Sequence, residues 1–281
     1  MSPLEAFLLG LLQGATEFLP VSSSGHLVLA QALMDVIGSG VGFEVLVHLA
    51  TLGAIVICLR RDVVGLVRGV LRLFRLMPRG VGDRSGGEER AGEQGSNTRR
   101  REERLALAVI VGTIPAVVAG LLFGSRLEAA FGRPDWAGGF LLVTGAVLLS
   151  TRLRHEGNRT LGPGVGFLIG VAQAAALLPG ISRSGFTIAA AILLGVPRGD
   201  AVRFSFMLAL PAMGGALLYT TLLGEGSLFE AAPLPSAVAF VAALASGSAA
   251  ILILLRAVRR GRFELFGLYC LVVGALAIAF L

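Results

Sequence analysis

The chain alternates between long apolar segments and short polar linkers. A helix needs roughly 18–20 apolar residues to cross a hydrocarbon core of about 30 Å. Six segments reach or approach that length: residues 44–59, 105–123, 136–151, 204–223, 234–255 and 265–281. We therefore expect an all-α polytopic membrane protein with about six full transmembrane helices, forming a single integral-membrane domain over residues 1–281.

Two other apolar segments are interrupted in the middle and align with each other without a gap. They are residues 10–25 and 170–185, and the matches pair Gly10 with Gly170, Gln13 with Gln173, Ser22 with Ser182, Ser24 with Ser184 and Gly25 with Gly185. Internal repeats in membrane proteins often build a site near the bilayer midplane. The two serine-rich breaks are therefore the first place to look for function.

Each copy of the repeat has the pattern of a helical hairpin that does not cross the membrane. A short apolar run, a break rich in Pro, Gly and Ser and a second short run follow one another, and neither run alone is long enough to span. Such a break is tolerated at membrane depth only where it lines protein or a water-filled cavity. We predict re-entrant hairpins at residues 3–38 and 161–196, within a first repeat of residues 1–59 and a second repeat of residues 161–223.

Composition and charge agree with a membrane protein. Charged residues make up 15% of the chain, against about 25% in an average soluble domain. The formal net charge of +6 comes from arginine alone, since the sequence has no lysine. These arginines occupy linkers between apolar runs, which is typical of cytoplasmic membrane loops and not of a nucleic-acid-binding surface.

The positions of the arginines predict the orientation. If residues 60–104 are cytoplasmic, if each long segment crosses once and if each hairpin returns to its own side, 21 of the 24 arginines lie in cytoplasmic linkers. Only Arg126 and Arg133 then lie outside, and Arg183 lies within a hairpin. On this map both termini are extracytoplasmic. The two hairpins enter from opposite sides, so the repeats are inverted and their tips meet near the midplane.

Two linker segments differ from the others. Residues 63–77 carry arginines among Val and Leu at helical spacing, which predicts an amphipathic helix at the membrane surface. Residues 79–104 are rich in Gly, Arg, Glu and Ser, and we predict a flexible cytoplasmic loop there. The two cysteines, Cys58 and Cys270, lie in apolar runs and indicate neither a disulfide framework nor a metal cluster.

Ionisable side chains inside apolar segments are costly to bury and are functional candidates for that reason. They are Glu17, His26, Glu44, His48 and Arg183. Glu44 and His48 could equally be polar residues at the end of a span. A buried Arg183 without an anionic partner would cost several kcal/mol, and its planar guanidinium suits phosphate oxygens. It is therefore the strongest indication of an anionic ligand.

The two hairpin tips have the composition of a phosphate site. Ser22-Ser-Ser-Gly25 and Ser182-Arg-Ser-Gly185 each place hydroxyls and backbone N–H groups at the start of a half-helix. The free N–H groups and the dipole of a helix N-terminus bind phosphate. A Ser-Gly cluster can also serve as a surface for close helix packing, and that alternative stays open for Ser22 and Ser24.

Glu17 and His26 suggest a cation and a base. A carboxylate repels phosphate unless a cation lies between them, and Gln13 and Glu17, four residues apart on one helical face, offer the oxygen ligands that Mg²⁺ or Ca²⁺ prefers. We therefore predict a divalent metal cation as cofactor. His26 lies three residues past Ser23 and could take the proton from a nucleophilic hydroxyl. The alternative for His26 is an interface residue at the mouth of the hairpin.

The motifs Gln13-Gly-Ala-Thr-Glu17-Phe-Leu-Pro-Val-Ser-Ser-Ser-Gly-His26 and Leu178-Pro-Gly-Ile-Ser-Arg183-Ser-Gly-Phe-Thr187 resemble the undecaprenyl-pyrophosphate phosphatase family associated with bacitracin resistance. The likeness covers essentially the whole chain. It implies hydrolysis of undecaprenyl pyrophosphate to undecaprenyl phosphate and inorganic phosphate, with a divalent cation. It also implies an active site at the outer face of the bacterial cytoplasmic membrane and a role in recycling the lipid carrier for peptidoglycan synthesis.

Carried over by position, the resemblance implies roles for single residues. Glu17 is similar to the essential acidic residue, Ser23 to the nucleophile, His26 to the catalytic histidine and Arg183 to the phosphate-binding arginine. The expected phosphate-binding residues are Ser22, Ser24, Gly25, Ser182, Ser184, Gly185 and Thr187. The family has Glu or Gln at position 13, and the Gln13 found here argues against a metal site made of two carboxylates.

A polyprenyl-phosphate transporter or flippase is the main alternative function, because inverted repeats with broken helices are also the architecture of secondary transporters. Ser23 with His26 favours an enzyme, since binding alone requires no base beside a hydroxyl. The expected partners are the lipid substrate and the membrane, with no nucleic acid. The sequence leaves open whether the chain forms a homo-oligomer, which metal is native, and whether Ser23 or a metal-activated water attacks.

Overall fold

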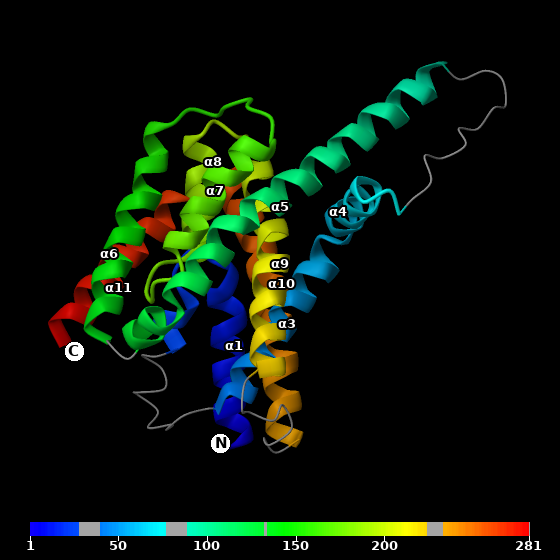
Figure 1. The fold of residues 1–281 in the computed structure, drawn as a ribbon. Helices are drawn as coiled ribbons and strands as arrows, with labels where there is room; N and C mark the ends of the chain where they lie inside the picture. The colour runs from blue at the N-terminus through cyan, green and yellow to red at the C-terminus, as the bar shows by residue number, and fades with distance from the viewer. Residues whose placement is uncertain (28–39, 77–88, 132–133, 224–232, 281) are drawn as a thin grey trace.

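The structure is a computed structural model that describes residues 1–27, 40–76, 89–131, 134–223 and 233–280, and within them it is helical with connecting turns (Figure 1). This confirms the all-α expectation for the described part of the chain. Its helices are α1 (Pro3–Phe18), α3 (Gly40–Cys58), α4 (Arg60–Leu73), α5 (Glu89–Phe131), α6 (Pro134–Ser150), α7 (Pro163–Ala175), α8 (Arg183–Leu193), α9 (Arg198–Leu223), α10 (Pro233–Arg259) and α11 (Glu264–Phe280).

The six expected spans correspond to α3, α5, α6, α9, α10 and α11. Within the described ranges, four helices are long and apolar enough to cross a membrane: α5, α6, α9 and α10. A fifth span is reached if α3 and α4, which are bent by 93° at their junction, count as one. Helices α7, α8 and α11 are shorter and apolar. The protein is therefore polytopic, and its shorter helices pack among the longer ones.

Two pairs of helices hold the bundle together at positions where glycine is required. Helix α1 packs along α10, and α7 packs along α5. A Cβ on Gly10 would lie 2.4 Å from the Ala239 carbonyl oxygen, and one on Gly170 would lie 2.1 Å from the Gly112 carbonyl oxygen. Gly10 and Gly170 are matched positions of the repeat, so the same small residue permits the same close backbone approach in each copy.

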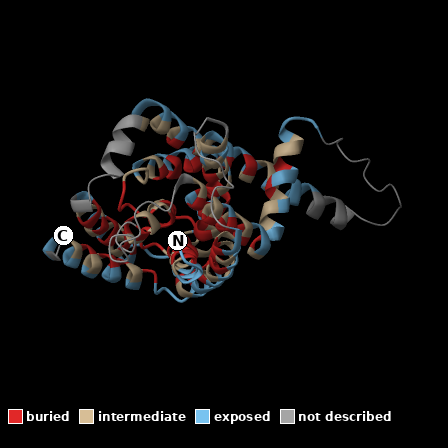
Figure 2. Ribbon diagram, turned by 90° about the horizontal axis from the view of Figure 1, so that it is seen from below, coloured by how far each residue is buried: buried red, intermediate tan, exposed pale blue. Residues whose placement is uncertain are grey.

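The core lies between these pairs, where buried residues gather at the centre of the bundle and exposed apolar faces lie outside (Figure 2). Phe18 at the end of α1 packs edge to face against Phe206 of α9, with ring centroids 5.3 Å apart. Leu148, Ile188 and Phe204 are fully buried around the same point. The end of α1 and the start of α8 are therefore fixed in one rigid core.

The prediction of a flexible loop over residues 79–104 is wrong for residues 89–104, which belong to α5. Residues 77–88 lie outside the described part of the chain. Arg and Glu are good helix formers, and α4 supplies a packing partner that composition alone does not reveal. Glu102 accepts from the guanidinium of Arg72, and a Cβ on Gly69 would lie 2.3 Å from the Glu102 carbonyl oxygen.

The amphipathic helix predicted over residues 63–77 is present as α4, with Leu66 buried and Val67 exposed. The second predicted hairpin is represented by α7, the break at residues 176–182, and α8. The Arg159 N–H donates to the Gly195 carbonyl at 2.9 Å, so the end of α8 returns to the chain that leads into α7. In the first hairpin, residues 23–27 are helical, and the remainder to residue 38 lies outside the described residues.

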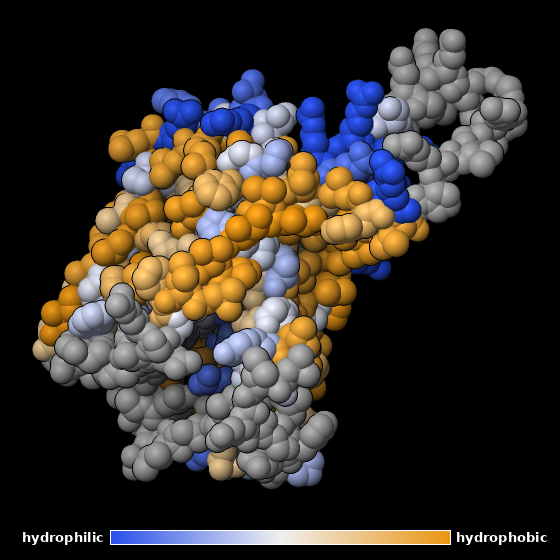
Figure 3. Space-filling view, viewed as in Figure 1, coloured by the Kyte–Doolittle hydropathy of each residue, from blue (hydrophilic) through white to orange (hydrophobic). Residues whose placement is uncertain are grey.

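The molecule has a hydrophilic end and an apolar belt. Figure 3 shows hydrophilic residues gathered at the upper end, above a band of apolar side chains. Figure 1 places the end of α6 and the adjoining loop at that end, and both termini at the other. Arg152, Arg154 and Arg159 of this loop are exposed. The predicted concentration of arginine at one end of the bundle therefore agrees with the described helices.

Candidate active site

Helix α1 carries Gln13 and Glu17 one turn apart on its buried face. The helix begins with a capping box in which Ser2 and Glu5 bond to each other's backbone N–H groups at 3.2 and 2.8 Å. It stops just before Pro20, because proline disfavours helical backbone in the residue before it. Gln13 Nε2 donates to Glu17 Oε2 at 3.0 Å. The shared face predicted from the spacing of the two residues is confirmed.

A tight turn after α1 directs Ser23 back toward Glu17. The Val21 N–H donates to the Leu19 carbonyl at 2.7 Å, and Ser22 has a φ of 68°, which is uncommon for a residue other than glycine. Helical backbone resumes at Ser23, whose Oγ donates to Glu17 Oε2 at 2.7 Å. Strained backbone of this kind is often kept where it positions a functional side chain.

The second tip presents Arg183 as the first residue of α8. Ser182 is the N-cap, and its Oγ accepts from the Gly185 N–H at 3.2 Å. Thr144 of α6 fixes this cap, since its Oγ1 accepts from the Ser182 N–H at 3.2 Å. Gly180, with a φ of 89°, allows the tip to approach α6, because a Cβ there would lie 2.5 Å from a carbonyl oxygen of that helix.

The two tips meet through an ion pair. Arg183 Nη2 donates to Glu17 Oε1, and the side chains of Arg183 and Glu17 are 20% and 7% exposed. The same Nη2 lies 3.0 Å from the sulfur of Met213 on α9. Arg183 Nη1 is buried and has no hydrogen-bond partner among the residues that the structure describes. A buried cationic donor without a partner is costly, so this nitrogen is available for an anionic ligand.

The serines repeat the same geometry in both tips. Ser22 Oγ and Ser24 Oγ are 3.4 Å apart, and Ser182 Oγ and Ser184 Oγ are 3.3 Å apart. Ser184 Oγ also donates to the Leu19 carbonyl at 3.3 Å, which joins the second tip to the first. Four of the predicted phosphate-binding residues therefore lie together where the hairpins meet.

His26 does not lie against Ser23 as the sequence suggested. Its Nδ1 is 2.8 Å from the Ser22 carbonyl oxygen, and its Nε2 is 2.7 Å from the hydroxyl of Tyr269 on α11. The imidazole also stacks on the Tyr269 ring, with centroids 5.7 Å apart. Among the hydrogen bonds of the described residues, the acceptor beside the Ser23 hydroxyl is Glu17 and not His26. The position of His26 is set by a neighbouring helix rather than by its spacing from Ser23.

Three of the remaining predicted residues have structural contacts. Thr187 Oγ1 is 2.6 Å from Ser205 Oγ in the core. A Cβ on Gly25 would lie 3.5 Å from Ser22 Oγ, and one on Gly185 would lie 3.1 Å from Ser182 Oγ. A side chain at Gly185 would therefore crowd the Ser182 cap, whereas the Gly25 distance is an ordinary contact. Thr187 links α8 to α9.

His48 extends the polar group around Glu17. Its Nε2 is 3.3 Å from Gln13 Nε2 and 3.9 Å from Glu17 Oε2, and its Nδ1 is 2.7 Å from the Glu44 carbonyl oxygen. Gln173, the repeat counterpart of Gln13, has a buried side-chain oxygen and nitrogen without hydrogen-bond partners. The sequence left the role of His48 open, and the structure places it next to the acidic residue.

These groups line one pocket of about 650 Å³. The polar side chains that face it are Glu17, Ser22, Ser23, Ser24, Glu44, His48, Gln173, Ser182, Arg183 and Thr220. Apolar residues of α5 and α9, among them Ala116, Met213 and Leu217, line it as well, together with Val45 of α3 and residues of the break between α7 and α8. The pocket thus combines a polar floor with an apolar wall, as an amphiphilic phosphate ester requires.

The predicted divalent cation would have Gln13 and Glu17 as its protein ligands. Within the described ranges, no group of three or more His, Cys, Asp or Glu side chains is placed to hold a metal ion. Within the described part of the chain, Gln13 Oε1 is a buried acceptor without a hydrogen-bond partner, beside Glu17. Mg²⁺ commonly takes one or two protein ligands together with phosphate and water. Gln13 and Glu17 fit such a site. The positively charged guanidinium of Arg183 already lies beside Glu17 and can neutralise it without a metal. The metal therefore stays a prediction.

Several contributors to the site could not be found from the sequence. Met213, Thr144 and Tyr269 lie in apolar runs whose pattern indicates only a membrane helix. Their roles depend on which helices become neighbours, and that information is absent from local spacing.

Comparisons with known proteins show the family of the chain. The model of the family described as bacitracin resistance protein BacA matches residues 6–276. The chain is 39% identical to an undecaprenyl-diphosphatase of Desulfosudis oleivorans, over 99% of this chain and 98% of that protein. It is 40% identical to one of Salinibacter ruber, over 98% and 97%, and 37% identical to one of Korarchaeum cryptofilum, over 96% of each chain. With a match along nearly its whole length, the chain belongs to the BacA family of bacitracin resistance proteins.

Proposed function

We propose that this protein is an undecaprenyl-diphosphatase, which hydrolyses undecaprenyl pyrophosphate to undecaprenyl phosphate and inorganic phosphate. Such a reaction recycles the lipid carrier of peptidoglycan synthesis and confers resistance to bacitracin. The names of the similar proteins support the activity. The observation that carries the proposal is the hydroxyl of Ser23 bonded to the Glu17 carboxylate. The same pocket holds Arg183, whose buried Nη1 has no hydrogen-bond partner among the described residues.

In the first step, Ser23 Oγ attacks the terminal phosphorus of the pyrophosphate. A bond forms between Oγ and phosphorus, the bond from phosphorus to the bridging oxygen breaks, and undecaprenyl phosphate leaves with that oxygen. Glu17 Oε2, 2.7 Å from Oγ, takes the serine proton. In the second step, water attacks the phosphorus of the phosphoserine, the bond from phosphorus to Oγ breaks, and inorganic phosphate leaves with the oxygen of the water. Glu17 returns its proton to Ser23 Oγ, and the protons of the attacking water leave with the phosphate or to solvent.

Arg183 and the hairpin tips stabilise the charge that develops on the transferred phosphoryl group. Nη1 of Arg183 can donate to an equatorial oxygen while Nη2 keeps its contact with Glu17. The first N–H groups of α8 and of the helical turn at Ser23 add donors and a favourable dipole. When bound, a divalent cation on Gln13 and Glu17 would neutralise further phosphate charge.

His26 has a positioning role in this scheme. It bonds to the Ser22 carbonyl and to Tyr269, and so holds the first tip in the conformation that turns Ser23 toward Glu17. The base in the proposed first step is Glu17, because it is the group that accepts the Ser23 hydrogen bond.

We also propose that the fold is an inverted repeat in which both hairpins are re-entrant. In support, α1 packs on α10 as α7 packs on α5. Figure 1 draws α1 in the lower half of the bundle and α7 and α8 in the upper half. The pocket extends to Glu44 near the start of α3 and Thr220 near the end of α9, away from the arginine-rich end. These positions favour an active site open to the extracytoplasmic face of the inner membrane.

The decisive experiment measures phosphate release from a polyprenyl pyrophosphate by the purified protein in detergent. We expect turnover by the parent and a loss of at least a hundredfold in Ser23→Ala. Ser248→Ala is the matched control and should leave the rate unchanged, because the Ser248 hydroxyl donates to the Leu244 carbonyl of its own helix, α10, and Ser248 does not line the pocket. Acid quenching with labelled substrate should trap phosphate on Ser23. An active Ser23→Ala protein would exclude serine attack, and absence of phosphate release from the parent would refute the proposed activity.

A further inference from the structure

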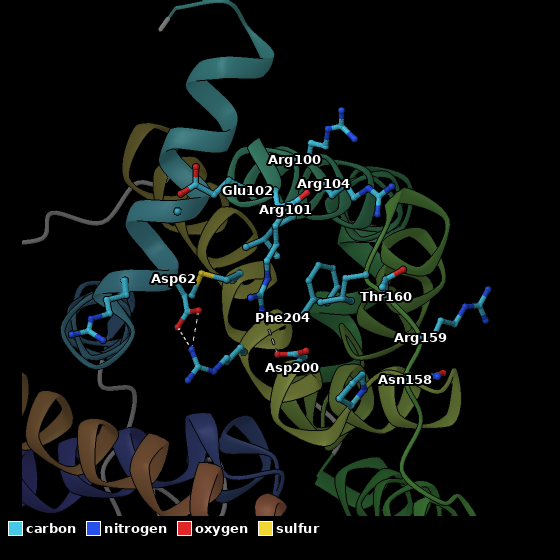
Figure 4. Close-up of a pocket in the computed structure, with 18 residues that line it drawn as sticks. Asp62, Arg100, Arg101, Glu102, Arg104, Asn158, Arg159, Thr160, Asp200 and Phe204 are labelled. Atoms are coloured by element: carbon cyan, nitrogen blue, oxygen red, sulfur yellow. Dashed lines mark hydrogen bonds and ion pairs between the residues drawn. The ribbon is translucent and has the colours of Figure 1, made fainter. Parts of the chain in front are cut away.

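A second pocket, of about 670 Å³, lies at the hydrophilic end of the bundle and shares no lining residue with the first. We call it the arginine pocket and define it by its six arginines: Arg61, Arg100, Arg101, Arg104, Arg159 and Arg203. Its walls come from the start of α4, the charged part of α5, the chain before α7 and the first turns of α9 (Figure 4). It is thus separate from the proposed catalytic chemistry.

The charged run at residues 97–105 of α5 builds one wall of this pocket. Asn97, Arg100, Arg101, Arg104 and Leu105 line it, and their spacing follows the 3.6-residue period of a single helix face. Because α4 holds this part of α5 in place through Gly69, the face is presented in a fixed direction. The same run predicts only a loop when it is considered by composition alone.

The arginine pocket has more cations than its own carboxylates can neutralise. Asp62 accepts both of its bonds from Arg203, at 2.7 and 3.0 Å, and Glu102 pairs with Arg72, which lies outside the pocket. Asp200 lies 3.9 Å from Arg101, whose side chain is 81% exposed. For the other four arginines, the described residues include no carboxylate within 4.0 Å: Arg61, Arg100, Arg104 and Arg159.

The pocket is amphiphilic and lies at the edge of the apolar belt. Leu105, Leu161, Phe204 and Met207 contribute apolar lining next to the arginines. Beside it, α4 exposes Val67, and the residues after α4 expose Phe74 and Leu76. Figure 4 shows Arg101 extended across the pocket toward Asp200, with Arg100 and Arg104 on the rim. A ligand here would meet guanidinium groups on one side and apolar surface on the other.

We propose that the arginine pocket is a second phosphate-binding site, which takes the phosphate diester of an acidic phospholipid from the leaflet on the arginine-rich side of the membrane. Guanidinium groups bind phosphate oxygens in pairs, and basic pockets between membrane helices bind anionic headgroups. The apolar lining favours a lipid over a free phosphate ion, because a lipid brings its own glycerol and acyl groups to that surface. Free phosphate shares the recognition chemistry, and the test separates the two.

The test is native mass spectrometry of the full chain in detergent, titrated with phosphatidylglycerol in one arm and with inorganic phosphate in the other. The variant is Arg101→Gln/Arg104→Gln. The matched control, Arg259→Gln/Arg260→Gln, removes the same charge from exposed positions at the end of α10 that do not line the pocket. Each arginine near an anionic surface contributes about fivefold to binding, so the variant should bind phosphatidylglycerol roughly 25-fold more weakly than the parent and the control.

Every outcome bears on the proposal. Weakened lipid binding in the variant alone, unaffected by excess inorganic phosphate, supports the phospholipid site. Weakened binding of inorganic phosphate alone would overturn the lipid and leave a free-phosphate site. Equal affinity in parent and variant, or an equal loss in variant and control, would overturn the specific pocket. Arg159→Gln changes the wall formed by the chain before α7 and should also weaken lipid binding. That result would show that the loss in the first variant does not come from a local distortion of α5. Phosphate release in lipid-free detergent should be unchanged in all variants, which separates this result from the proposed activity.

Discussion

The ion pair between Glu17 and Arg183 should contribute measurably to the stability of the folded protein. It joins residues 166 positions apart and holds the two hairpin tips together. Its side chains are 7% and 20% exposed. Removing one partner of a buried pair leaves an uncompensated charge and typically costs about 3–5 kcal/mol. Since the Arg183 side chain is partly exposed, we expect Glu17→Gln to lower the free energy of unfolding by about 3 kcal/mol. Arg183→Gln should lower it by a similar amount.

The double variant Glu17→Gln/Arg183→Gln removes both charges at once and should be less damaged than the sum of the single variants. The expected coupling is about 1–3 kcal/mol. Thermal melting of the purified proteins in detergent should show losses of roughly 5–10 °C for each single variant. The double variant should melt clearly above the temperature expected from adding the two single losses.

The rate of phosphate release by the same variants is a second measurement, independent of melting. Glu17→Gln removes the proposed base and should lower the rate of phosphate release by about 10²–10⁴-fold, and restoring the charge balance in the double variant should not restore that rate. If the effects on melting were additive, the two residues would not stabilise each other. If Glu17→Gln released phosphate at the parent rate, the carboxylate would be structural only.

Four further predictions test the site and the fold. EDTA should abolish phosphate release and Mg²⁺ or Ca²⁺ should restore it, whereas full activity in chelator would remove the metal role. Arg183→Lys keeps the charge but loses the planar fork and should lose about 10²-fold in rate, with Arg183→Ala lower still. In a cysteine-free background, Ser2→Cys should react with a membrane-impermeant reagent on intact cells and Arg152→Cys should not; the reverse would invert the orientation. Gly14→Val should reduce the yield of folded protein sharply, because a Cβ there would lie 2.2 Å from the Ala243 carbonyl oxygen of α10; a normal melting curve would contradict that packing.

The sequence predicted the helices and the composition of the site better than its internal contacts. The spacing of Gln13 and Glu17 was sufficient, because four residues along one helix fix which side chains meet. The repeat predicted that the two tips meet. The hydrogen bond from Ser184 Oγ in the second tip to the Leu19 carbonyl in the first agrees with that prediction. The direction of His26 was not predictable, because Tyr269, which sets it, is 243 residues away in sequence.

The charged segment of α5 was missed for the same physical reason. Composition rich in Gly, Arg, Glu and Ser is typical of flexible chain, and the helical state of residues 89–104 depends on a neighbour. Arg72 on α4 binds Glu102, and Gly69 lets the two helices touch. Local propensity is a weak guide wherever tertiary contacts decide the conformation.

The pairing of α1 with α10 has a consequence for how the protein is made. At the contact of Gly10 with Ala239, the partner of the first helix leaves the ribosome roughly 230 residues later, a delay of about 10–45 s at 5–20 residues per second. During that interval the glycine face of α1, and the nearby Gln13 and Glu17, have no partner on α10. The contact that seats α1 in the bundle therefore forms only after nearly the whole chain has been translated.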